Sequence, residues 1–283
     1  MSDWERLVRF IPKDSTEVHI GEPDPSISDV GLALFNSREV SVNLVEGDIF
    51  SGRVTGRQVK IGKLLAPIAQ AQCQIVRCIG LNYHDHAEEL SLDIPKVPTL
   101  FIKPSSALAD PFPGTIAIPK AAQDDTCDYE AELAIVIKKT GRDIPEHEAL
   151  DYVLGYTCAN DVTARSHQLS QSQWCFAKGM DGFCPIGPVL VSPSQIRSEF
   201  VVRCFHNGDM VQDGNTKDFI FPIERIISFV SQGTTLAKGS VILTGTPAGV
   251  GYYRNPRITL KHHDEVQVYI SQIGTLVNKV EDL

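Results

Sequence analysis

Short apolar runs of strand length, rather than long amphipathic helices, dominate the hydrophobic pattern of this chain. Four such runs follow residue 74, at 75–79, 133–137, 189–191 and 240–243, and Gly- and Pro-rich segments separate them. Short apolar runs bounded by turn residues are typical of buried strands. The pattern therefore predicts a core built mainly from β-sheet.

Helical spacing of apolar positions is confined to four segments. These are 84–92, 146–152, 163–170 and 222–232, and Pro222 fits the first turn of the last one. The sequence shows neither a fixed repeat nor a regular alternation of strands and helices, which argues against a solenoid and against a doubly wound sheet. We therefore predict a β-rich α+β fold.

The first 72 residues differ from the rest in their pattern of apolar and turn-forming residues. Two alternating runs, Val30–Phe35 and Glu39–Leu44, predict strands between turn-rich segments, and no residue in this part suggests chemistry. We therefore predict a small β-rich N-terminal lobe over residues 1–72 and a larger domain that carries the function over residues 73–283.

Composition and charge restrict the function classes. With 26 Lys and Arg against 35 Asp and Glu, the formal net charge is −9, which repels a phosphate backbone, so we expect no nucleic-acid partner. No apolar run approaches the ~18 residues that span a bilayer, and the first residues lack a signal-peptide pattern. We expect a cytoplasmic protein without a membrane partner.

The seven cysteines form no Cys-x-x-Cys pair, which indicates reduced, mostly buried thiols.

Three carboxylates form the first candidate site. Glu130 and Glu132 alternate along a predicted strand, so they share one face about 7 Å apart, and Asp161 follows the strand-like run 152–159. Either the two glutamates lie at a solvated strand end and Asp161 caps a helix, or all three converge on a cation. Three oxygen ligands without Cys or His favour Mg²⁺, with Mn²⁺ or Ca²⁺ as alternatives, over zinc.

Two further features could supply acid–base and electrostatic chemistry. His86 and Glu89 stand three residues apart on a predicted helix, which suits either a general base with its orienting carboxylate or an incidental surface ion pair. Lys178 lies in a Gly-rich segment, where it either stabilises a developing oxyanion or is a solvated charge.

A Gly-rich turn at 244–251 is a third feature. It lacks the Gly-Lys-Ser/Thr ending of a nucleotide-binding P-loop. Its backbone N–H groups and the Thr246 hydroxyl could instead contact a small carboxylate.

Taken together, these motifs resemble the fumarylacetoacetate hydrolase family. Seven of them stand in the family's order over residues 64–281: Leu64–Ile68, Gly80–Tyr83 with His86 and Glu89, Asp128–Leu133, Asn160–Arg165, Lys178–Pro188, Thr244–Gly251 and Ile273–Asn278. The resemblance implies a mixed β-roll or β-sandwich, assembled as a homodimer, in which residues 84–97 are a candidate lid.

The resemblance also implies roles for individual residues. It assigns Glu130, Glu132 and Asp161 as metal ligands, His86 and Glu89 as the water-activating pair, Lys178 as the oxyanion-stabilising lysine, and Arg165, Gln168 and Thr246 as substrate contacts. Two departures bear on the substrate, because many members have Arg in place of Leu81 and Asp in place of Ser166.

The implied function is a Mg²⁺-dependent hydrolase that cleaves a carbon–carbon bond in a small 2-oxo or 1,3-dicarbonyl carboxylic acid, of the acylpyruvate or fumarylacetoacetate type. A tautomerase or decarboxylase of oxaloacetate or a related 2-oxo acid is the alternative, because it needs the same enolate chemistry. A catalytically silent binding protein is a third hypothesis, which the occupied acid, base and ligand positions disfavour.

Overall fold

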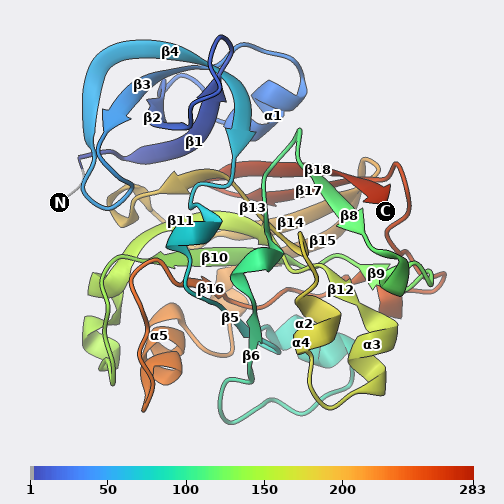
Figure 1. The fold of residues 1–283 in the computed structure, drawn as a ribbon. Helices are drawn as coiled ribbons and strands as arrows, with labels where there is room; N and C mark the ends of the chain where they lie inside the picture. The colour runs from blue at the N-terminus through green and yellow to red at the C-terminus, as the bar shows by residue number, and fades with distance from the viewer. Residues whose placement is uncertain (1–2) are drawn as a thin grey trace.

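A computed structural model describes residues 3–283 and confirms the predicted β-rich α+β fold (Figure 1). The larger sheet follows the path β2-β3-β4-β1-β13-β11-β10-β16-β5-β6, with β7 beside β13. Its strands are β1 (Arg6–Pro12), β2 (His19–Pro23), β3 (Ser41–Glu46), β4 (Arg53–Leu65), β5 (Val76–Ile79), β6 (Leu100–Lys103), β7 (Leu108–Ala109), β10 (Ala131–Ile137), β11 (Val153–Asn160), β13 (Cys184–Val191) and β16 (Val241–Leu243).

A smaller sheet packs against the larger one. It follows the order β15-β14-β17-β18-β8, and β12 and β9 form a separate pair. The bounds are β8 (Thr115–Ile118), β9 (Cys127–Asp128), β12 (Thr163–Ala164), β14 (Val201–His206), β15 (Asp209–Asn215), β17 (Glu265–Ile270) and β18 (Gly274–Asp282). One core cluster joins the facing residues of the two sheets, including Leu133 of β10, Val202 of β14 and Leu276 of β18.

The helices are short. They are α1 (Val30–Phe35), α2 (His84–Glu89), α3 (Arg165–Ser170), α4 (Cys175–Lys178) and α5 (Ile223–Ser231). The 3₁₀ segments are η1 (Gln70–Gln72), η2 (Ser105–Ala107), η3 (Lys120–Ala122), η4 (Glu146–Tyr152), η5 (Pro193–Gln195), η6 (Thr216–Asp218) and η7 (Gly251–Tyr253). None of the helices within residues 3–283 has the length and apolar character needed to cross a membrane.

Three of the four predicted helical segments contain an α-helix, and the differences are local. The segment 146–152 is a 3₁₀ helix, and residues 163 and 164 pair in β12 before α3 begins. Pro222 has an extended ψ of 163° and precedes α5 rather than lying in its first turn. Neither position requires the proline to donate an intrahelical hydrogen bond, so the missing N–H group alone does not separate them.

The prediction that Val30–Phe35 is a strand is wrong, because this run forms α1. The Asp29 side chain accepts a hydrogen bond from the Leu32 amide at 3.0 Å and caps the helix. A Cβ atom on Gly31 would lie 1.8 Å from the Thr275 carbonyl oxygen, so α1 packs directly on the β18 backbone. The six-residue apolar run fits nearly two turns of helix as well as a strand, and Asp29 is a residue type that caps helices.

Strand β10 is buried on both faces, which explains its nearly continuous apolar sequence. Leu133, Ile135 and Ile137 pack in the core between the sheets, whereas Ala134 and Val136 pack in the second core on the opposite face. Alternation places Glu132 on the same face as Ala134 and Val136. The predicted alternation of this segment is therefore confirmed, and it sends the acidic side chains away from the core between the sheets.

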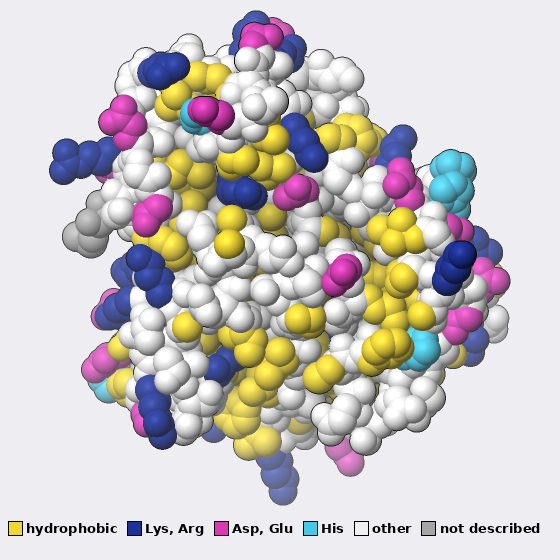
Figure 2. Space-filling view, viewed as in Figure 1, with side chains coloured by type: hydrophobic (Ala, Val, Ile, Leu, Met, Phe, Trp, Pro, Cys, Tyr) yellow, Lys and Arg dark blue, Asp and Glu magenta, His cyan; other side chains and the backbone are white. Residues whose placement is uncertain are grey.

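Strand β1 connects the N-terminal strands to the remainder of the larger sheet. It pairs with β2 and β4 and, through Arg6 and Leu7, with β13. The helices α2, α3 and α4 gather on the side of the molecule away from these N-terminal strands (Figure 1). Strand β6 is the last strand of the sheet path, and apolar side chains gather on the surface where it lies (Figure 2), consistent with partly exposed Leu100 and Ile102.

All seven cysteines are free thiols, and six of them are buried. Cys175, the exposed one, lies at the start of α4. The prediction that the thiols are mostly buried is therefore confirmed.

Candidate active site

The three predicted acidic ligands lie together in the interior. Glu130, Glu132 and Asp161 are buried, and one carboxylate oxygen from each lies within 4.8 Å of the others. Antiparallel pairing of β10 with β11 brings them together, because the Asp161 amide donates to the Glu130 carbonyl at 2.9 Å. The strand end is therefore not solvated. Asp161 does not cap the helix either, because Ala164 is the residue before α3.

Two of the three carboxylates have cationic partners. Lys178 Nζ donates to Glu130 Oε2 at 2.9 Å, to Asp161 Oδ2 at 2.7 Å and to the Thr163 hydroxyl at 2.8 Å. Burial raises the pKa of the Glu130 carboxyl, but Lys178 and Arg165 outweigh it and hold this pKa at about 2. Burial lowers the pKa of Lys178, yet Asp161 and Glu130 raise it to about 12. Lys178 and Glu130 therefore both stay charged at neutral pH.

Glu132 differs from its two neighbours. Its Oε2 accepts from the Gly245 amide at 2.6 Å, whereas its Oε1 is buried without a hydrogen-bond partner. Burial, followed by repulsion from Asp161 and Glu130, raises the pKa of this carboxyl well above its ordinary value. A buried carboxylate oxygen without a partner, next to two other hard oxygen donors, fits a hard divalent cation. The residues present therefore fit a metal site.

Two buried residues that sequence reasoning did not assign complete the charge balance. Lys103, at the end of β6, contacts Asp161 and donates to the Val162 carbonyl at 3.1 Å. Asp128 accepts from Arg165 Nε at 2.9 Å and from the Gly251 amide at 2.9 Å. Asp128 lies in the acidic motif, but only the folded chain shows that it holds Arg165, and Lys103 has no sequence signal beyond an unexpected charge after an apolar run.

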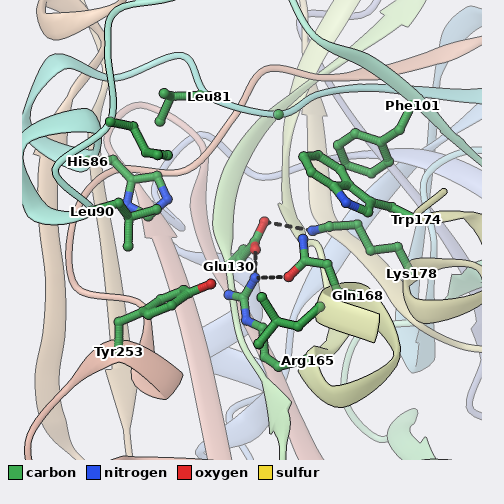
Figure 3. A pocket seen from close by; sticks show the side chains of 13 residues that line it. Leu81, His86, Leu90, Phe101, Glu130, Arg165, Gln168, Trp174, Lys178 and Tyr253 are labelled. Atoms are coloured by element: carbon green, nitrogen blue, oxygen red, sulfur yellow. Dashed lines mark hydrogen bonds and ion pairs between the residues drawn. The ribbon is translucent and has the colours of Figure 1, made fainter. Parts of the chain in front are cut away.

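The contact predicted between His86 and Glu89 is present on α2. His86 Nδ1 lies 2.8 Å from Glu89 Oε2, and the other carboxylate oxygen of Glu89 accepts from the Gly249 amide at 2.9 Å. His86 is buried and lines the same cavity as Glu130 and Lys178 (Figure 3). The carboxylate fixes the ring, which leaves Nε2 as the nitrogen without this partner.

Arg165 and Gln168 reach the cavity from α3. Arg165 Nη1 lies 2.7 Å from Glu130 Oε1 and donates to Gln168 Oε1 at 3.0 Å (Figure 3). Thr246 is placed differently. Its hydroxyl donates to the Ala131 carbonyl at 3.0 Å and accepts from Gln212 Nε2 at 2.7 Å, and it is not among the residues that line the cavity. A substrate contact for Thr246 stays a prediction. The observed hydrogen bond of Thr246 holds Ala131, the first residue of β10.

The cavity above the carboxylates has a volume of about 180 Å³. Glu130, Arg165 and Lys178 meet at its centre, His86 and Leu90 face them from one side, and Phe101 and Trp174 face them from the other (Figure 3). Leu81, which departs from the family's more common Arg, also lines this cavity. One carboxylate of the cluster, the imidazole of the His86–Glu89 pair and a buried lysine therefore line one small cavity, which suits activation of a carbonyl compound.

Comparison with known proteins places this arrangement in a family. The family model described as fumarylacetoacetate (FAA) hydrolase C-terminal matches residues 75–281. A caffeoylpyruvate hydrolase of Neonothopanus nambi is 43% identical, with 99% of this chain and 94% of that protein covered. A mitochondrial oxaloacetate tautomerase of Rattus norvegicus is 41% identical over 76% of this chain and 68% of that protein.

The fold agrees with this sequence similarity. A crystal structure of a 2-hydroxyhepta-2,4-diene-1,7-dioate isomerase from Mycobacterium marinum aligns with a TM-score of 0.80 and 33% identity, covering 98% of each chain. The chain belongs to the fumarylacetoacetate hydrolase family.

Proposed function

We propose that this protein is a Mg²⁺-dependent hydrolase that cleaves the carbon–carbon bond of an acylpyruvate. The observation that carries the proposal is the cavity that Glu130, His86 and Lys178 line together. Glu130 belongs to the carboxylate cluster with Glu132 and Asp161, and His86 is paired with Glu89. The similarity to a caffeoylpyruvate hydrolase over nearly the whole chain supports it.

Glu130, Glu132 and Asp161 would hold the metal ion, and Mg²⁺ is our first choice because all the donors are hard oxygens. When bound, a divalent ion at this position polarises the oxygens of a 2-oxo acid and favours its enolate form. Lys178 donates hydrogen bonds to two of the same carboxylates, those of Glu130 and Asp161. If these carboxylates held the metal ion, Lys178 would give up part of this hydrogen bonding and could donate to substrate instead.

The remaining residues account for the hydrolytic step. His86, oriented by Glu89, takes a proton from water at Nε2, and the resulting hydroxide adds to the distal carbonyl carbon of the substrate. Lys178 stabilises the oxyanion. The carbon–carbon bond then breaks, its electron pair leaves as the enolate of pyruvate, and protonation of this enolate yields pyruvate beside the released carboxylic acid. Arg165 and Gln168 are placed to orient the substrate's carboxylate.

A second candidate function is tautomerisation of oxaloacetate. It is favoured by the similarity to the rat oxaloacetate tautomerase and needs the same base, because His86 could move a proton between carbon and oxygen of an enolisable acid. It differs in requiring no water as nucleophile.

One experiment separates these functions. The protein with Mg²⁺ is mixed in turn with acetylpyruvate and oxaloacetate, and products are followed by NMR. Acetate and pyruvate from acetylpyruvate support hydrolysis, whereas keto–enol exchange of oxaloacetate without cleavage of either acid supports the tautomerase. Glu130→Ala should abolish turnover and bound metal together, and Glu148→Ala on the exposed η4 segment serves as the control. Metal-independent turnover would contradict the proposal.

We also propose a catalytic unit over residues 73–283 with a small N-terminal lobe over 1–72, a homodimeric assembly and a cytoplasmic location. The family match to residues 75–281 supports the division. Light scattering on the purified protein measures the mass and would contradict the dimer if it returned the 31.1 kDa of one chain.

A further inference from the structure

The outer part of the active-site cavity is apolar. Leucines at positions 81, 90 and 92 lie on the side of α2, and Phe101, Trp174 and Leu169 lie on the sides of β6, α4 and α3. Figure 3 shows Leu81 and Leu90 opposite Phe101 and Trp174, with Glu130 and Arg165 between and below them. The two walls therefore form a slot that leads outward from the charged centre.

The charged groups of the cavity are confined to its inner end, where they are already paired. Arg165 contacts Asp128 at 2.8 Å and Glu130 at 2.7 Å, and Lys178 contacts Glu130 and Asp161. The other lining residues include no Lys or Arg. A carboxylate in the outer slot would lie against leucine and aromatic side chains without gaining a Lys or Arg partner, which is unfavourable to the extent that the slot excludes water. The slot therefore suits an uncharged group.

The aromatic wall is closely packed where the slot meets the centre. The Phe101 and Trp174 rings pack edge to face with centroids 5.4 Å apart, and Lys178 Nζ lies 4.9 Å from the Phe101 ring centroid. A Cβ atom on Gly80 would come within 3.1 Å of the Trp174 ring, so the glycine leaves room for the indole. Two packed aromatic rings facing leucine side chains present flat surfaces, which favour a planar apolar guest.

From this arrangement we propose that the outer slot is a subsite for an uncharged aromatic acyl group, and that it disfavours substrates with a second, distal carboxylate. The inference rests on the proposed function for the position of the 2-oxo acid at the inner end. It goes further by assigning the substrate class and by naming Leu81 and Leu169 as residues that determine specificity.

Binding tests the subsite without relying on turnover. Phenylpyruvate and 2-oxoglutarate, which share the 2-oxo acid but carry a phenyl ring or a second carboxylate, are titrated into the Mg²⁺-loaded protein while tryptophan fluorescence is recorded. We expect phenylpyruvate to bind at least about tenfold more tightly, the lower range for apolar discrimination in a pocket. Equal affinities, or tighter binding of 2-oxoglutarate, would overturn the inference.

Three variants locate the effect. Leu81→Arg adds a cation to the slot and should reverse the preference towards 2-oxoglutarate. Leu169→Ala removes part of one wall and should weaken phenylpyruvate binding several-fold while leaving 2-oxoglutarate unchanged. Leu150→Ala, at a similarly exposed leucine on η4 outside the cavity, should change neither affinity. If Leu81→Arg and Leu169→Ala leave the ratio of affinities at the unmodified value, the subsite is refuted.

Turnover then distinguishes this inference from the proposed function. If benzoylpyruvate is cleaved at least about tenfold more efficiently than acetylpyruvate in kcat/KM, both proposals gain support. Equal cleavage of benzoylpyruvate, acetylpyruvate and an acylpyruvate with a distal carboxylate would leave the hydrolase proposal standing and refute the subsite. If none is cleaved but phenylpyruvate binds selectively, the hydrolase proposal fails and the subsite is supported.

Discussion

Replacing Glu132 by Gln tests the electrostatic account of the carboxylate cluster. The amide oxygen of a glutamine can keep the 2.6 Å bond from the Gly245 amide, and its NH₂ group can donate to Glu130 or Asp161. The change removes the one carboxylate of the three that lacks a cationic contact within residues 3–283. We therefore expect the metal-free Glu132→Gln protein to be more stable than the unmodified one, and to lose its response to Mg²⁺.

The size of both effects follows from the burial of Glu132. An unpartnered buried polar group costs about 1–3 kcal/mol. With about 2.1 cal/mol/K of unfolding entropy per residue, 283 residues give roughly 0.6 kcal/mol/K, so 1 kcal/mol moves Tm by about 1.7 °C. The substitution should then raise the metal-free Tm by about 2–5 °C. Mg²⁺ at 100 times its Kd should stabilise the unmodified protein by about 2.7 kcal/mol, or about 4.5 °C.

Thermal unfolding in EDTA and in Mg²⁺, between pH 5 and 8, measures these shifts. The folded-state pKa of Glu132 is raised, so its contribution to stability is present below the unfolded pKa and is lost as pH rises through the folded one. The advantage of Glu132→Gln in EDTA should therefore grow from pH 5 to pH 8. Glu148→Gln, at an exposed side chain, is the control and should follow the unmodified protein.

Two results would refute this reasoning. A Glu132→Gln protein that is less stable in EDTA across the whole pH range would show that other interactions offset the cost of burying the Glu132 carboxylate. A Glu132→Gln protein that still gains the full Mg²⁺ stabilisation would show that Glu132 is not a ligand.

Three further predictions concern other parts of the molecule. His86→Ala should lower kcat by about 10²–10⁴-fold, as expected for loss of a general base, while Tm changes little; steady-state kinetics beside thermal unfolding checks this, and an equal loss of both would favour a structural role. Lys103→Met removes one of the two buried cations at Asp161 and should cost about 3 kcal/mol in EDTA. Mg²⁺ should restore part of that loss in urea unfolding, and full stability without metal would argue against the pairing. Gly31→Ala should unfold at markedly lower urea, because its Cβ would lie 1.8 Å from the Thr275 carbonyl oxygen; an unchanged midpoint would contradict the close packing of α1.

The parts of the site that the sequence could predict are those set by local periodicity. Extended spacing at the start of β10 predicted Glu130 and Glu132 near one another, and helical spacing predicted His86 beside Glu89. Lys103 and Asp128 could not be assigned in this way, because their partners Asp161 and Arg165 lie 58 and 37 residues away in the sequence and contact them only in the folded chain.

Local pattern also failed where two structures fit the same residues. The run Val30–Phe35 has too few positions to distinguish a strand from two turns of helix. Its contacts in the folded protein determine that it forms a helix. The tertiary contact of Gly31 with β18 selects the helix, and that contact cannot be read from neighbouring residues.

The bond between Asp29 and Thr275 bears on how the protein is made. Asp29 caps α1 and also accepts from the Thr275 amide and hydroxyl, 246 residues further along the chain. During translation, the N-terminal strands emerge from the ribosome long before β18 is synthesised. The hydrogen bonds between Asp29 and Thr275 can therefore form only near the end of translation. Contacts of such large sequence separation slow folding and leave early segments exposed while they wait. The nascent N-terminal segment therefore cannot complete the packing of α1 until β18 has been synthesised.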